Sequence, residues 1–163
     1  MNNNPFKQLL QDIDAPSAIL SDERDGFLLS LMVLASYTIQ ADIVVAQAEI
    51  EYIDNFLRQH FGEEKRQKYG IVLYRLLAES RKYPTPLWQS KVRDCAYSLA
   101  MHNNTEERLL LLAFLIKISK ADNLVTASEV STIALVAQWL GVSAEAAMSI
   151  DTLKAEIITS WKL

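Results

Sequence analysis

The sequence predicts an all-α protein of about seven helices in a single compact bundle, and three observations lead to this prediction. The 163 residues include only four glycines and four prolines, so few positions interrupt regular structure. Apolar residues recur at three- and four-residue steps, which is the period of an amphipathic helix. The sequence has no pair of alternating apolar segments joined by a hairpin turn such as Asn-Gly.

The first half of the chain is expected to supply an N-terminal extension, residues 1–20, and the beginning of a domain that spans residues 21–163. Pro5 to Ile13 should form a short helix in the extension. A largely apolar helix should follow from the N-cap Ser21 to about Gln40. Three helices are expected next, at Ala46–His60, Glu63–Ser80 and Leu87–Met101. Gly70 lies inside the second of these, where glycine costs about 1 kcal/mol of helix stability relative to alanine, so its presence predicts a close contact with another helix.

The second half of the chain contains the longest uninterrupted apolar run. Leu109 to Ile116 lies in a helix expected from about Asn104 to Lys120, which we therefore predict to be the most buried element. The next helix should begin at the N-cap Thr126, and Glu129, three residues later, can complete a capping box with it. Its predicted inner face consists of Val130, Ile133, Ala134, Val136, Ala137 and Leu140, and Gly141 should end it. Two short helical pieces, near 144–149 and 152–160, should close the domain.

Two stretches of the chain repeat one pattern. Asp42 and Glu49 in the first stretch have the same spacing as Asp122 and Glu129 in the second. In each stretch an apolar helix precedes the first acid, and an amphipathic helix ending in glycine follows. Two copies are too few for a solenoid, so we predict a two-fold-like pairing of helix hairpins with the apolar helices crossing at the centre.

The repeated motif resembles the TerB-like family, which includes the tellurite-resistance protein TerB and the N-terminal domain of DjlA-type co-chaperones. In each copy an apolar helix ends in Ala-Asp and is followed by Val-x-x-x-Glu, at Val45–Glu49 and Val125–Glu129. Arg24–Leu28 and Phe56–Glu63 are similar to a DjlA-type branch found in Bacteroidetes-like proteins. The resemblance covers residues 22–150 and implies this helical fold.

The chain departs from the family's Ala-Asp-Gly pattern at two positions. Ile43 and Asn123 replace the glycine, and only asparagine tolerates a left-handed backbone, so we expect the first loop to be reshaped. The sequence also lacks the His-Pro-Asp tripeptide of a J-domain. Stimulation of a partner chaperone is therefore not implied.

The candidate site comprises the four acids Asp42, Glu49, Asp122 and Glu129. One interpretation is purely structural, because acids at helix N-termini cap backbone N–H groups and oppose the helix dipole. The alternative is that the four carboxylates converge on a hard divalent cation such as Ca²⁺ or Mg²⁺, which prefers oxygen ligands. The resemblance to TerB-like proteins implies the same cation site, although the spacing is not that of an EF-hand.

Other chemistry is not indicated by the sequence, and we expect no enzymatic activity and no obligatory cofactor. Cys95 is the single cysteine, so an internal disulfide is excluded and a buried apolar role is expected. His60 and His102 fall near helix ends, where a solvated or capping role is usual. The sequence contains no Gly-x-Ser-x-Gly and no phosphate-binding loop.

Charge and hydropathy narrow the class of partner. A net charge of −4 and a pI of about 5.2 argue against nucleic-acid binding. The N-terminus has no signal-peptide pattern, and no apolar run approaches the roughly 20 residues of a membrane span. We expect a cytoplasmic helical protein-interaction module, in a stress-response context related to tellurite resistance, with an unknown protein partner. A homodimer is compatible with the sequence, and a divalent-metal-binding or sensing domain is the alternative function.

Overall fold

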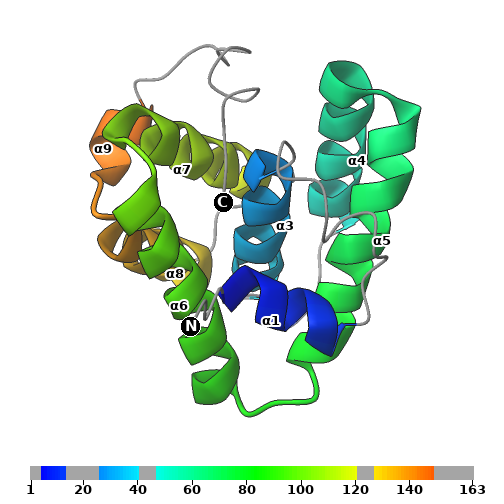
Figure 1. Ribbon diagram of the computed structural model, residues 1–163. Helices are drawn as coiled ribbons and strands as arrows, with labels where there is room; N and C mark the ends of the chain where they lie inside the picture. Colours follow the sequence, from blue (N-terminus) through cyan, green and yellow to red (C-terminus); the bar gives the residue numbers. More distant parts are fainter. Residues whose placement is uncertain (1–4, 14–25, 41–46, 121–126, 149–163) are drawn as a thin grey trace.

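The computed structural model describes residues 5–13, 26–40, 47–120 and 127–148. Within these ranges the chain forms eight α-helices and no β-strand, which confirms the predicted all-α class (Figure 1). The predicted helices, where they fall within these ranges, agree with the observed ones except for small shifts of their ends. The helices are α1 (Pro5–Asp12), α3 (Gly26–Ile39), α4 (Gln47–Phe61), α5 (Glu63–Ser80), α6 (Thr85–His102), α7 (Thr105–Ser119), α8 (Ala127–Leu140) and α9 (Ala144–Met148).

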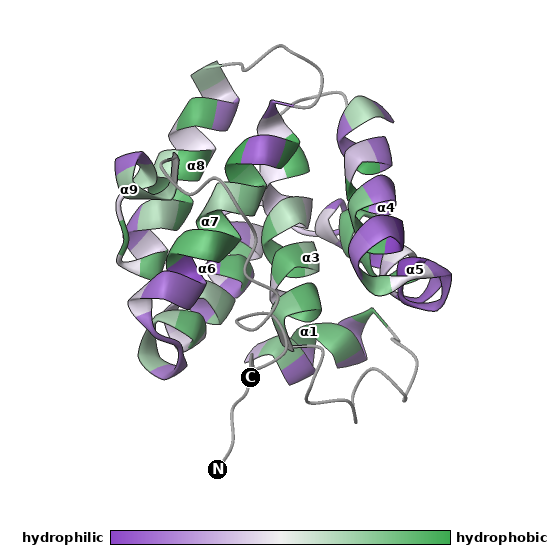
Figure 2. Ribbon diagram, turned by 90° about the horizontal axis from the view of Figure 1, so that it is seen from above, coloured by the Kyte–Doolittle hydropathy of each residue, from purple (hydrophilic) through white to green (hydrophobic). Residues whose placement is uncertain are grey.

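Helix α3 lies at the centre of the bundle. It packs against α5, α6, α7 and α8, and Figure 1 shows α4 and α5 on one side of it and α6, α8 and α9 on the other. Every side chain from Phe27 to Ile39 is buried except that of Tyr37, which is half-buried. The hydrophobic colours along most of α3 in Figure 2 agree with this position. A helix with neighbours on all sides must be apolar around its whole circumference.

Helix α7 is also part of the core, but the prediction that it is the most buried element is wrong. Its residues Leu110 to Leu115 are all buried, whereas Thr105, Glu106 and Lys117 are exposed, so α3 is the more completely enclosed helix. The centroid of the Phe114 ring lies 5.8 Å from that of Phe27 on α3 and 4.4 Å from that of Phe56 on α4. The predicted contact between the two apolar helices is therefore present, while the two-fold repeat stays a prediction.

The inner face of α8 differs from the predicted one. Ile133, Val136, Ala137 and Leu140 are buried as expected, but Val130 is 57% exposed and Ala134 is exposed, so the prediction is wrong at these two positions. The reason is that Glu129 lies on the buried face. Each helical residue advances about 100° around the axis, so Val130 is turned away from the face that Glu129 shares with Ile133.

The helix ends are closed largely as the sequence predicted. The Asn104 side chain accepts a hydrogen bond from the Glu107 backbone N–H at 2.8 Å, so Asn104 caps α7. Gly141 has a φ of +69° and follows α8. The backbone N–H of Gly141 donates a hydrogen bond to the carbonyl oxygen of Gln138, and that of Val142 donates one to the carbonyl oxygen of Ala137, both at 3.1 Å. This pair of bonds is the Schellman arrangement.

The predicted close contact at Gly70 is wrong. A Cβ atom added there would meet its nearest neighbour, Asp54 Oδ1, at 3.8 Å, which is an ordinary van der Waals distance. Several other predictions, including the N-caps Ser21 and Thr126, fall outside the described residues and stay predictions, as do the helical piece at 152–160 and the domain boundary at residue 20.

Candidate functional site

Two of the four candidate acids lie in the described part of the chain, and both are buried. Glu49 is 2% exposed in the first turn of α4, and Glu129 is 1% exposed in the first turn of α8. Each glutamate begins the buried face of its helix, because an isoleucine follows four residues later, Ile53 in α4 and Ile133 in α8. The two carboxylates therefore occupy corresponding places in the two helices.

The other two acids, Asp42 and Asp122, lie outside the described residues, so the convergence of all four stays a prediction. In the described ranges, no three His, Cys, Asp or Glu side chains are grouped as metal ligands would be. Neither Glu49 nor Glu129 is without a partner. A buried carboxylate needs such partners to offset its desolvation, and the positive end of the helix dipole favours an acid in the first turn.

The single cysteine lies where nucleophilic chemistry is disfavoured, and the two histidines lie near helix ends. Cys95 is fully buried in α6, and burial raises the pKa of its thiol far above the usual value, so the sulfur stays protonated. His60 and His102 are both exposed near helix C-termini, as predicted. The His102 ring Nδ1 lies 2.8 Å from the Ser98 carbonyl oxygen, one turn earlier in the same helix.

A groove runs between α1 and α6, and we call it the α1–α6 groove. It encloses about 890 Å³, and its lining includes Leu9, Asp94, Tyr97, Met101 and His102. Two apolar side chains of α6 stand open to solvent beside it, since Tyr97 is 47% and Met101 80% exposed. They are four residues apart and therefore share one face of the helix.

A second hollow, the α4–α5 groove, lies on the other side of α3. It encloses about 520 Å³ and is lined by Ile50, Asp54, Gly70, Ile71 and Tyr74, among others. Ile71 is 46% and Tyr74 is 75% exposed, so the outer side of α5 is apolar at its middle.

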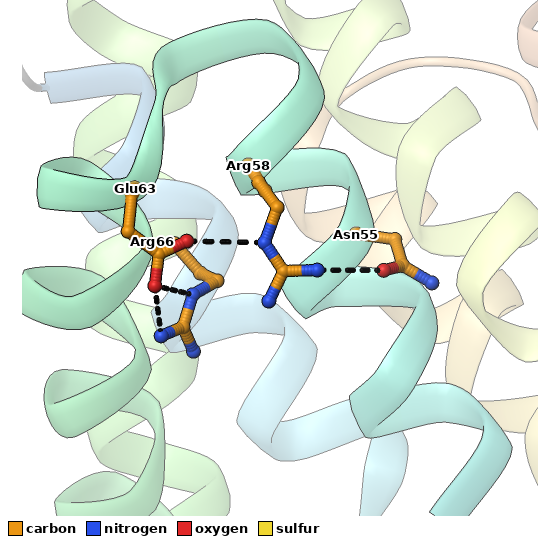
Figure 3. A network of polar contacts seen from close by, with 4 residues as sticks. All are labelled: Asn55, Arg58, Glu63 and Arg66. Atoms are coloured by element: carbon orange, nitrogen blue, oxygen red, sulfur yellow. Dashed lines mark hydrogen bonds and ion pairs between the residues drawn. The ribbon is translucent and has the colours of Figure 1, made fainter.

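Polar contacts hold the turn between α4 and α5 (Figure 3). Glu63 accepts hydrogen bonds from Arg66 Nε at 2.8 Å and from Arg58 Nε at 3.0 Å, and it also pairs with Arg66 Nη2. Arg58 extends the network to Asn55 Oδ1 at 3.4 Å. Hydrogen bonds from Arg66, and then those from Arg58, lower the pKa of the Glu63 carboxyl to about 2.

The exposure of four apolar residues that line the grooves was not predicted from the sequence: Ile71, Tyr74, Tyr97 and Met101. A signal was present for the first two. The helical period of Tyr69, Val72 and Leu76 defines the buried face of α5, and an apolar residue on the opposite face of an amphipathic helix is an exception that periodicity reveals.

The fold and these surfaces define a class of protein, an all-helical domain whose described surface offers two grooves with exposed apolar side chains along them. The chain belongs to the TerB family, because the family model described as "Tellurite resistance protein TerB" matches residues 28–152. This confirms the resemblance found in the sequence, while the DjlA-type branch stays a prediction. No curated protein and no solved structure matches the chain in these comparisons.

None of the described helices combines the length and the apolar character that crossing a bilayer requires.

Proposed function

We propose that this TerB-family domain binds another protein through the α1–α6 groove, in a stress-response context related to tellurite resistance. The observation that carries the proposal is the exposure of Tyr97 and Met101 side by side on α6, at 47% and 80%. Tyrosine and methionine are enriched at protein interfaces, where they bury apolar area on binding. The proposed role is one of binding rather than catalysis.

The surroundings of the two side chains support this proposal. Leu9 of α1 is buried at one wall of the groove, and the charged residues Asp94 and Lys91 border it. Lys91 is held in place by Asp12 Oδ2 at 3.6 Å and by the Tyr83 ring, whose centroid lies 5.1 Å from Nζ. Exposed apolar side chains next to charged residues that are held in place are common in protein-binding surfaces.

Replacement of Met101 by glutamate tests the proposal. The wild-type protein, Met101→Glu and Val130→Glu would each be immobilised and exposed to a lysate of the source cells. Val130 is a matched control, because it is another exposed apolar residue, on α8 and outside the groove. We expect a protein retained by the wild type and by Val130→Glu to be lost by Met101→Glu. Equal retention by all three proteins, or no specific retention, would contradict the proposal.

The alternative function, a domain that binds or senses a divalent metal, draws on a different observation. Glu49 and Glu129 are both buried at the starts of their helices, and carboxylate oxygens are the ligands that Ca²⁺ and Mg²⁺ prefer. Asp42 and Asp122 would complete the ligand set. Calorimetric titration with each metal tests this function, with Glu129→Gln expected to weaken binding and the exposed Glu145→Gln expected to leave it unchanged. No heat and no melting shift at millimolar metal would exclude it.

A further inference from the structure

Helix α5 carries a second surface, which is independent of the proposed α1–α6 binding site. Five of its exposed residues and the exposed C-cap residue Arg81 follow one another at alternating steps of three and four, the heptad spacing of a helix-pairing seam. We call this set the α5 stripe. It consists of Glu64, Gln67, Ile71, Tyr74, Ala78 and Arg81.

The stripe has an apolar middle and opposite charges at its two ends. Ile71 and Tyr74 lie at its middle, Glu64 at its N-terminal end and Arg81 at its C-terminal end. A partner helix that fits this pattern must be apolar at its middle, with a basic residue opposite Glu64 and an acidic residue opposite Arg81. The same stripe running in the opposite direction meets each of these requirements.

We propose that α5 pairs with α5 of a second copy of this chain, antiparallel and about a two-fold axis, to form a homodimer. A two-fold interface is isologous, so every contact occurs twice. Glu64 of each copy faces Arg81 of the other at both ends of the pair. Ile71 of each copy faces Tyr74 of the other next to the axis, and Gln67 faces Ala78.

Charge selects the antiparallel arrangement over the parallel one. In a parallel pair, Glu64 would face its own copy at one end and Arg81 would face its own copy at the other. Like charges in contact destabilise an interface, whereas opposite charges guide its register. The antiparallel pair is therefore the arrangement in which both ends of the stripe meet a residue of opposite charge.

The rest of the surface is suited to this pairing. The α4–α5 groove adjoins the stripe, since Gln67, Ile71 and Tyr74 also line it, and it offers space for the Tyr74 ring of the second copy. The hydrogen bond from Arg58 of α4 to Glu63 fastens the start of α5 to α4. The stripe is thus presented on a helix that does not need to be ordered when the dimer forms.

The dimer should be a weak one. The 18 residues of α5 span roughly 27 Å, so the paired helices form a small interface. Arg75 borders the stripe near its middle, and the Arg75 side chains of the two copies would repel each other. We expect dissociation in the micromolar range, which a concentration series can follow.

Sedimentation equilibrium of the full chain over a series from about 1 µM to 1 mM tests the proposal. The average mass of the wild type should rise from 18.4 kDa toward twice that value. Ile71→Glu should remain at the monomer mass throughout, because it places an acid at the apolar middle. Val130→Glu, an equally drastic change at an exposed residue outside α5, should behave as the wild type. Circular dichroism would confirm that each variant keeps its helical content.

Charge exchange separates this dimer from any other self-association. Glu64→Arg alone and Arg81→Glu alone each set like charges against one another at both ends, so each should weaken the dimer at least tenfold. The double variant Glu64→Arg/Arg81→Glu restores opposite charges and should recover wild-type association.

Two results would overturn the proposal. If the wild type stays at the monomer mass over the whole series, the α5 stripe does not pair with a second copy of itself, and any partner of the stripe is a different protein. A dimer that persists in Ile71→Glu, or one that the double charge exchange fails to restore, would place the interface elsewhere. Neither result bears on the α1–α6 groove, whose test uses different residues.

Discussion

At the scale of single residues, Gly141 shows how one backbone angle constrains the choice of side chain. Its φ of +69° lies in the left-handed region, and a Cβ atom there would lie 3.1 Å from Arg108 Nη1, which donates a hydrogen bond to the Leu140 carbonyl oxygen. We expect Gly141→Ala to lower the free energy of unfolding by about 1–2 kcal/mol, as measured by urea denaturation. An unchanged denaturation midpoint would contradict this prediction.

Gly70 should respond in the opposite direction. It lies within α5, and an added Cβ would meet only Asp54 Oδ1 at 3.8 Å. Gly70→Ala should therefore raise the free energy of unfolding by up to about 1 kcal/mol, because alanine has the higher helix propensity. The same urea experiment measures it. A loss of stability would support the close helix contact that the sequence alone suggested.

The Glu63 network gives the stability of the protein a dependence on acid pH. The pKa of Glu63 falls from 4.5 to about 2 in the folded state, so the stabilisation is complete above pH 4.5 and is lost as the pH falls toward 2. Glu63→Gln should therefore melt at a lower temperature than the wild type at pH 7, and the difference should shrink between pH 4.5 and 2. Glu145→Gln serves as control. A difference that is constant with pH would show that the carboxylate charge is not responsible.

At the scale of helices, burial rather than apolar content decides which element the fold depends on most. Leu31 of α3 is fully buried, whereas Leu87 of α6 is 47% exposed. We expect Leu31→Ala to lower the free energy of unfolding by about 2–5 kcal/mol, and Leu87→Ala by about 0.5 kcal/mol or less. Equal losses in chemical denaturation would contradict the central position of α3.

Periodicity predicted the helices well, but it did not fully predict which face of each helix is buried. On α6, the helical spacing of Trp88, Val92, Cys95 and Leu99 indicates one apolar face, and all four residues are buried. On α8, in contrast, the rule that apolar residues face inward placed Val130 in the core, whereas the structure exposes Val130 and buries Glu129. Burial depends on which neighbouring helices surround α8, and that information is not local in the sequence.

At the scale of the whole molecule, the sequence predicted the fold class and the family, but only part of the candidate site. The motif around Val125 to Glu129 was sufficient to indicate the TerB family. Whether acids from two distant turns converge depends on long-range packing, which spacing alone does not determine. The exposed pair Tyr97 and Met101 was missed for a similar reason, since its exposure depends on how α1 crosses α6.

The two proposed surfaces lie on different sides of the bundle. Figure 1 shows α6 on one side of α3 and α5 on the other, with α1 in front. A dimer formed through α5 would therefore leave the α1–α6 groove of each copy open. One assembly could then hold two partner molecules, which increases the effective affinity for a partner that is itself multivalent.

Photo-crosslinking in the source cells tests the central claim, that the α1–α6 groove binds another protein, most directly. Tyr97 would be replaced by a photoreactive phenylalanine analogue, with the same replacement at Val130 as control. We predict a defined adduct with another protein from position 97 that is absent from position 130 and disappears when Met101→Glu is added. No adduct from position 97, or the same adducts from both positions, would contradict the claim.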